Sequence, residues 1–164
     1  MKRYIAATLA LLATATVSMA QLSGTLTIQG SVASVVSITV TPVAGYNTLD
    51  IVNGVSGQTV ANLTERCNHK PGYTVTMTSL NAGASGNSLF LADTAGGVGT
   101  DTVPYSLTYN SVPVTFASGS ATLTDSNGKT AAAGVTKALA VTLAASWVAQ
   151  ATYADTLTFT IAGK

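Results

Sequence analysis

The sequence predicts an all-β protein folded as an antiparallel β-sandwich. Several segments alternate apolar and polar residues with a period of two, which is the pattern of half-buried strands. Charged residues make up only 8% of the chain, and Thr, Ser, Asn and Gln take their place, a composition that favours strands over helices. No window shows the 3.6-residue period of an amphipathic helix. About eight short strands separated by turns are therefore expected.

The first twenty residues have the features of a secretory signal peptide. Lys2 and Arg3 precede an apolar run from Tyr4 to Val17, and Ser18-Met19-Ala20 supplies the small residues that signal peptidase requires. The run is shorter than the about 20 residues that a membrane-spanning helix needs. We therefore expect residues 1–20 to be removed and the exported chain to be Gln21 to Lys164.

The exported chain would be nearly neutral and would form one domain. Without Lys2 and Arg3, seven basic residues become five against six acidic ones, a formal charge of −1. Nucleic acids and anionic membranes are bound by clustered Lys and Arg, so neither nucleic acid binding nor membrane insertion is expected. Cys67 is the single cysteine, so no disulfide can form within the chain, and this free thiol is expected to be buried.

The longest uninterrupted alternation begins at Gln21. Even positions from 22 to 32 carry only apolar residues and glycine, and odd positions from 21 to 31 carry only polar ones. As a strand, this segment would have one apolar edge and span roughly 40 Å at about 3.3 Å per residue. It follows the cleavage site without a turn, and Gly24 and Gly30 stand where a strand of a packed core more often carries Val or Ile. These two features favour a strand that fits a groove in a neighbouring copy, although the sequence leaves open whether it pairs within its own chain.

The same alternation predicts the remaining strands in order, and turn residues bound them. These strands are expected at residues 36–40, 73–78, 103–109, 112–116, 121–123, 139–143 and 153–161. Asn110-Ser111 and Asn127-Gly128 are the predicted tight turns. Pro113 confines its strand to a sheet edge or an outward-facing position. Gly and Ser clusters at 81–87 and 95–99 predict loops.

The residue pattern offers no constellation for catalysis, so no enzyme is expected. His69 is the single histidine and is interpreted as an exposed loop residue, because nothing specifies an orienting carboxylate. The six acidic residues are scattered, and we expect them to be solvated instead of paired for glycoside hydrolysis. One Cys and one His cannot form a zinc site, and Gly96-Gly97-Val98-Gly99 lacks the strand-to-helix context of a phosphate-binding loop. No catalytic, metal-binding or cofactor-binding residue is therefore predicted.

Three segments share a pattern with a known family. They are Leu26 to Val40, Glu65-Arg66-Cys67-Asn68 leading to Gly72-Tyr73-Thr74-Val75, and Ala151 to Ile161. In these segments the chain resembles subunits of chaperone-usher pili and the related spore coat protein U-like secreted pilins. The resemblance implies an immunoglobulin-like sandwich that lacks its last strand. A periplasmic chaperone would fill the groove first, and the N-terminal extension of the next subunit would then replace it.

This resemblance also implies an organisation and a set of interface residues. Residues 1–20 would be the signal peptide, residues 21–34 the donor-strand extension and residues 35–164 the pilin-like sandwich. Subunits exported through the periplasm to an outer-membrane usher would form a head-to-tail homopolymer, an extracellular pilus that serves adhesion. The groove-filling face would be Leu22, Gly24, Leu26, Ile28 and Gly30. The C-terminal strand bordering the groove would carry Tyr153, Leu157, Phe159 and Ile161.

Other protein classes fit parts of the same pattern. A self-complete secreted β-sandwich could be a coat component or a carbohydrate-binding module, which would present exposed aromatic residues. Only Tyr46, Phe90 and Trp147 of the exported chain fall outside a clear alternating pattern. A small outer-membrane barrel would need strands of about ten residues, and segments such as Leu107 to Tyr109 are short for that.

Overall fold

The computed structural model describes residues 23–83, 86–95 and 101–164. The predicted signal peptide, Gln21, Leu22 and the glycine-rich segment 96–99 lie outside these residues. The described residues fall into two units, residues 23–32 and the described part of residues 33–164. All the strands belong to the second unit.

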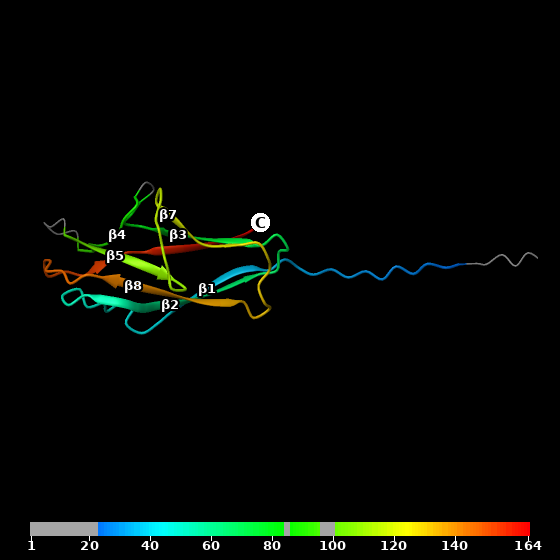
Figure 1. Ribbon diagram of the computed structural model, residues 1–164, viewed down its shortest axis with the longest axis horizontal. Coiled ribbons are helices and arrows are strands. Elements are labelled where there is room, and N and C mark those ends of the chain that lie inside the picture. The colour runs from blue at the N-terminus through cyan, green and yellow to red at the C-terminus, as the bar shows by residue number, and fades with distance from the viewer. Residues whose placement is uncertain (1–22, 84–85, 96–100) are drawn as a thin grey trace, which may run out of the picture. The chain divides into compact units, whose positions relative to one another are not determined.

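The second unit is built from two antiparallel sheets. In chain order the strands are β1 (Val36–Pro42), β2 (Val55–Cys67), β3 (Tyr73–Ser79), β4 (Leu89–Asp93), β5 (Thr102–Tyr109), β6 (Val112–Pro113), β7 (Ser120–Ser126), β8 (Val135–Leu143), β9 (Tyr153–Ala154) and β10 (Leu157–Gly163). The larger sheet has the order β1-β2-β8-β5-β4-β9, with β6 paired to β5, and the smaller sheet has the order β10-β3-β7. Figure 1 shows β3 and the red β10 in one layer and β1, β2 and β8 in the other. The predicted all-β, antiparallel sandwich is confirmed.

No helix among the described residues has the length and apolar character needed to cross a membrane.

The strand order follows that of an immunoglobulin fold. In that fold, strands A, B, E and D form one sheet and strands C, F and G form the other. With β1, β2, β3, β5, β8 and β10 taken as A to F, the path β1-β2-β8-β5 reproduces A-B-E-D and the pair β3-β10 reproduces C-F. No strand of the described residues lies in the G position, beside β10 and away from β3. Both β1 and β10 are therefore edge strands.

The core lies between the two sheets and is made by the inward faces of the central strands. Along β3, Tyr73, Val75, Met77 and Ser79 are buried, while the threonines between them are less so. Leu63 of β2 and Leu139 of β8 are also almost completely buried. Each such large apolar side chain contributes about 1.5–3 kcal/mol when it leaves water. This packing holds the two sheets together.

The turn between β5 and β6 agrees with the sequence. Asn110 and Ser111 both have positive φ, at 50° and 67°, as a type I′ hairpin turn requires. The strand that follows is shorter than predicted, because only Val112–Pro113 pairs with β5.

The predicted strand from Tyr153 to Ile161 is wrong as a single element. The structure divides it into β9, which pairs with β4 of the larger sheet, and β10, which pairs with β3 of the smaller one. Asp155 lies at the crossing, where its carboxylate accepts hydrogen bonds from Ser79 Oγ and Tyr105 Oη, both at 2.6 Å. Because these bonds draw Asp155 toward two strands of different sheets, the chain changes sheets at this residue.

Candidate functional site

An open apolar groove lies between the edge strands β1 and β10. Val40 and Pro42 of β1 form one rim, and Leu157 and Phe159 of β10 form the other. The floor comes from the strands between them and includes Ala61, Leu107, Leu139 and Val141. The pocket has a volume of about 320 Å³, and apart from Asp155, Thr156 and two tyrosines its lining residues are apolar.

The rims of this groove are incompletely buried. Leu157, Phe159 and Ile161, the alternate apolar residues of β10, are only half-buried, whereas the equivalent residues of the neighbouring β3 are buried. Val40 on the opposite rim is 41% exposed. None of the described strands pairs with the outer edges of β1 and β10, so the backbone N–H and C=O groups there are a template for a further strand. The groove thus offers both apolar contacts and backbone hydrogen bonds.

The groove is open at one end and filled at the other. Val36 and Ile38 of β1 and Ile161 of β10 pack against the buried cluster of Cys67, Tyr73 and Val75. At this end the two sheets are therefore bridged by their own side chains. At the other end, Val40, Pro42, Leu157 and Phe159 line the open pocket.

The predicted groove-filling face lies in the first unit. Residues 23–32 are not in any strand, and the side chains of Leu26 and Ile28 are 86% and 89% exposed. A Cβ atom added to Gly24 or Gly30 would meet nothing within 4 Å. Leu22 lies outside the described residues. The assignment of this face to a groove stays a prediction.

The predicted groove-bordering residues are only partly brought together. Leu157, Phe159 and Ile161 share the half-buried face of β10. Tyr153 is on β9 in the other sheet, and its hydroxyl donates to the Ala149 carbonyl oxygen at 3.0 Å. The placement of Tyr153 on the same strand is therefore wrong.

Asp155 and Tyr105 form a polar contact in the wall of the groove. Burial raises the pKa of Tyr105, and the hydrogen bond to Asp155 and the negative charge of that carboxylate raise it further. The tyrosine therefore stays protonated and remains a donor. Asp155 also accepts from the backbone N–H groups of Asn81 and Thr156, at 3.1 and 2.7 Å, so it fixes the entry into β10.

Replacing Tyr105 by phenylalanine is expected to reduce the free energy of unfolding by about 1–3 kcal/mol, because a largely buried acceptor loses a charged hydrogen bond. The matched control is Tyr153→Phe, which removes a hydroxyl bonded to an exposed loop carbonyl. Urea unfolding followed by circular dichroism would measure both. Equal effects of the two substitutions would contradict a special role for the contact with Asp155.

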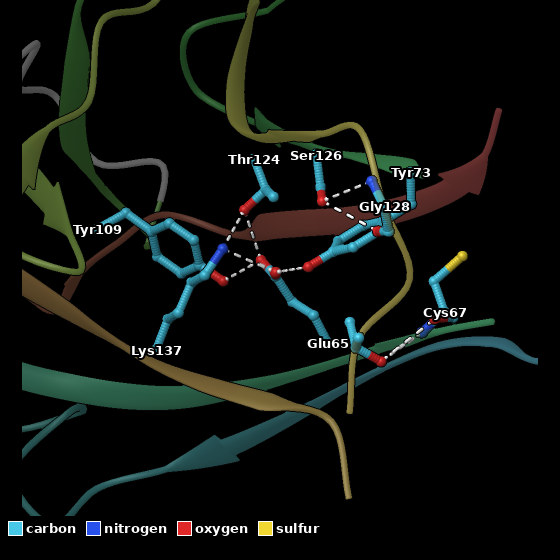
Figure 2. Close-up of polar contacts among 9 residues, drawn as sticks. Glu65, Cys67, Tyr73, Tyr109, Thr124, Ser126, Gly128 and Lys137 are labelled. Atoms are coloured by element: carbon cyan, nitrogen blue, oxygen red, sulfur yellow. Dashed lines mark hydrogen bonds and ion pairs between the residues drawn. The ribbon is translucent and has the colours of Figure 1, made fainter. Parts of the chain in front are cut away.

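A second polar cluster, centred on Glu65, was missed by sequence reasoning. Glu65 is completely buried, against the expectation that the acidic residues are solvated. Its carboxylate accepts hydrogen bonds from Tyr73 Oη, Tyr109 Oη and Thr124 Oγ1 at 2.8, 2.6 and 2.7 Å, and it pairs with Lys137 Nζ at 2.8 Å. Figure 2 shows these side chains converging on the carboxylate from both sheets. The cluster ties β3 and β7 to β2, β5 and β8.

The Glu65 carboxylate is held in its charged form. Burial raises its pKa, but the hydrogen bonds from Lys137, Tyr109, Thr124 and Tyr73 together outweigh burial and leave the pKa below its usual value. The Lys137 ammonium also lies 5.4 Å from the centre of the Tyr109 ring, within reach of a cation–π interaction. Every polar atom of the cluster thus has a partner, as a structural network requires.

Cys67 and His69 lie near the filled end of the groove. Cys67 is buried, as expected. His69 is half-buried instead of exposed, and its Nε2 is hydrogen-bonded to Ser34 Oγ at 2.7 Å. Within the part of the chain that the structure describes, no three His, Cys, Asp or Glu residues are grouped as a metal site.

Comparison with known protein families gives no match, and comparison with curated proteins gives none either.

Proposed function

We propose that this chain is a structural subunit of an extracellular pilus that polymerises head to tail by strand donation and serves adhesion. The acceptor site is the groove between β1 and β10. The donor is the N-terminal segment of another copy, with Leu22, Gly24, Leu26, Ile28 and Gly30 as its groove-filling face. The observation that carries the proposal is the open apolar groove at the position where an immunoglobulin fold has strand G.

A strand in this position would meet both the backbone groups at the edge of β10 and the apolar side chains that line the groove. Its backbone would pair with the free edge of β10, and its alternate side chains would enter the apolar pocket. Burial of apolar surface stabilises such a contact by about 25 cal/mol per Å². The N-terminal segment has the required alternation, and its Leu26, Ile28 and Val32 are exposed. Because donor and acceptor surfaces differ, the contact repeats as an open fibre instead of closing a dimer.

The partners and location belong to the same proposal. An apolar groove exposed during export would aggregate, which is a physical reason for a periplasmic chaperone to cover it. An outer-membrane usher and delivery to the cell surface follow from the resemblance to pilins and from the signal-like residues 1–20. Adhesion rests on the resemblance alone. No chemical reaction is part of the proposed role.

The alternative is a self-complete secreted sandwich that acts as a coat component or carbohydrate-binding module. The observation that favours it is the exposed ring of Trp147, which is 92% accessible and could stack on a sugar. A self-complete sandwich, however, would have its G position filled by its own chain. The open groove therefore supports the pilus subunit more strongly.

The deciding experiment compares the mature chain, residues 21–164, with the same chain lacking residues 21–32. Size-exclusion chromatography and electron microscopy would give the association state of each. We expect fibres or ladders from the mature chain and none from the shortened one. A mature chain that is a stable monomer and unfolds without residues 21–32 would refute strand donation and place this strand in its own core.

A further inference from the structure

An exposed apolar surface surrounds Trp147, in the connection between β8 and β9. It is formed by Ile51, Val52, Trp147 and Val148, and is called the Trp147 surface below. Trp147 is 92% exposed and Val52 is 57% exposed. The backbone that presents Trp147 is tied down, because Ser146 N donates to the Ile51 carbonyl and Ala149 N to Asp101 Oδ2, both at 2.9 Å. The tryptophan is thus displayed by an anchored loop.

The Trp147 surface is continuous with the open end of the groove. A hollow of about 500 Å³ lies between them and shares Tyr46 and Leu49 with the groove. The same hollow shares Ile51 and Tyr153 with the Trp147 surface. The groove, this hollow and the Trp147 surface are therefore adjacent to one another.

The direction of the donor strand determines which of its ends emerges at the open end of the groove. β10 begins at Leu157, beside the open pocket, and ends at Gly163 near the β2–β3 turn, where Lys164 N donates to the Gly72 carbonyl at 3.0 Å. A strand in the G position runs antiparallel to β10, as all pairs in these sheets do. Its N-terminal residues would lie near Gly163, and its C-terminal residues would emerge beside Leu157.

The short connection between the donor strand and β1 limits how far the folded domain of the donor can lie from the groove. If residues 22–30 occupy the groove, only residues 31–35 separate them from the start of β1 at Val36. Five extended residues span at most about 17 Å. The folded domain of the donor is thereby held close to the open end of the groove, with its own filled end facing the acceptor. That end carries the exposed apolar residues Val35 and Val135.

We propose that the Trp147 surface is a second contact between consecutive copies, and that it receives the end of the donor's folded domain from which the N-terminal segment emerges. This inference rests on the proposed strand donation and adds a contact between folded domains to it. The contact would place Val35 and Val135 of the donor against the apolar side chains of the Trp147 surface. Such a contact would limit bending at each junction of the fibre.

Trp147 is the only tryptophan in the chain, so its fluorescence reports on this contact directly. The experiment measures acrylamide quenching and the emission maximum of Trp147 in two samples. One is the polymer of residues 21–164, and the other is the same residues with Ile28→Asp, which disables the donor face. We expect several-fold weaker quenching and a blue-shifted emission in the polymer. A peptide of residues 21–32 added to the variant should fill the groove, raise its melting temperature and leave Trp147 as quenchable as before, because no donor domain is attached.

A pair of matched substitutions tests the surface without removing the probe. Val52→Asp should restore quenching of Trp147 in the polymer, whereas Val112→Asp, at a comparably exposed valine on β6, should not. A polymer in which Trp147 is as quenchable as in the Ile28→Asp variant would overturn the inference and leave strand donation intact. A mature chain that forms no polymer would overturn both.

Discussion

Replacing Ile28 by aspartate abolishes assembly, if the N-terminal segment donates its even-numbered face to a neighbour. Ile28 is 89% exposed in its own chain, so the substitution has little reason to disturb folding. In the complex, the carboxylate would enter an apolar groove, and burying a charge without a partner costs several kcal/mol. Since about 1.4 kcal/mol is a tenfold change in affinity, association should weaken by about 100-fold or more.

The adjacent Thr27 supplies the matched control. Thr27 is also exposed and lies on the polar face of the alternating segment, which would point away from the groove. Thr27→Asp should therefore assemble nearly as well as the unmodified chain, measured by sedimentation and electron microscopy at equal concentrations. If both variants lost assembly equally, the added charge would be the cause and the strand register would play no part. If neither variant lost assembly, the segment would be excluded from the interface.

Mixing two variants tests the head-to-tail direction. Val40→Asp places the charge on the rim of the groove, at a partly exposed position, so this chain can donate its strand but accepts one poorly. Ile28→Asp has the reverse defect. Each variant alone should stay monomeric, and the mixture should stop at a heterodimer, because the groove that remains in the pair is blocked. Long fibres from the mixture would contradict this arrangement.

The sequence predicts several of the strands whose inward positions are apolar, although β4, with Leu89 and Leu91 buried, was not among them. β1, β3, β5 and β8 were expected because their inward positions carry Val, Ile, Leu, Met or Tyr. β2 was missed, although it is the longest strand. Its buried positions include Ala61 and Glu65, which break the apolar pattern, and its pairing with β8 has register shifts near Thr59. Alternation fails as a signal where a buried position holds a small or charged residue.

The polar networks could not be predicted for a different reason. The four partners of Glu65 are 8, 44, 59 and 72 positions away in the sequence. Nothing local to Glu65 indicates that two tyrosines, a threonine and a lysine will surround it, because the sheets must form before these side chains meet. Asp155 shows the same limit. Its neighbours continue a perfect alternation, and only its bonds to Ser79 and Tyr105 explain the change of sheet.

Replacing Glu65 by glutamine should cause the largest loss of stability of any single change considered. The substitution keeps the shape but removes the charge that pairs with Lys137, whose side chain is only 17% exposed. Breaking a buried ion pair by removing one partner costs about 3–5 kcal/mol, a large part of the about 5–15 kcal/mol that stabilises a typical domain. Urea unfolding at pH 7, in the Ile28→Asp background to keep the chain monomeric, would measure the loss.

The control is Asp125→Asn, which makes the same change of charge at a surface pair with Lys164. Surface pairs contribute about 0–1 kcal/mol, so this variant should unfold close to the parent. Lys137→Met should cost less than Glu65→Gln, because Glu65 keeps three hydroxyl donors. Similar small losses in all three variants would show that the buried cluster does not hold the sheets together.

The pH dependence follows from the sign of the Glu65 shift. Its pKa in the folded protein is below the usual value of 4.5, so the unfolded chain binds the proton more readily. The stabilisation from Glu65 is complete at pH values above 4.5 and is lost as the pH falls through the folded value. The difference in unfolding free energy between the parent and Glu65→Gln should therefore be constant from pH 7 to about 5.5 and shrink in more acidic solution. A difference that instead grows on acidification would mean that Glu65 is already protonated in the native sandwich, and that the contact with Lys137 is a neutral hydrogen bond.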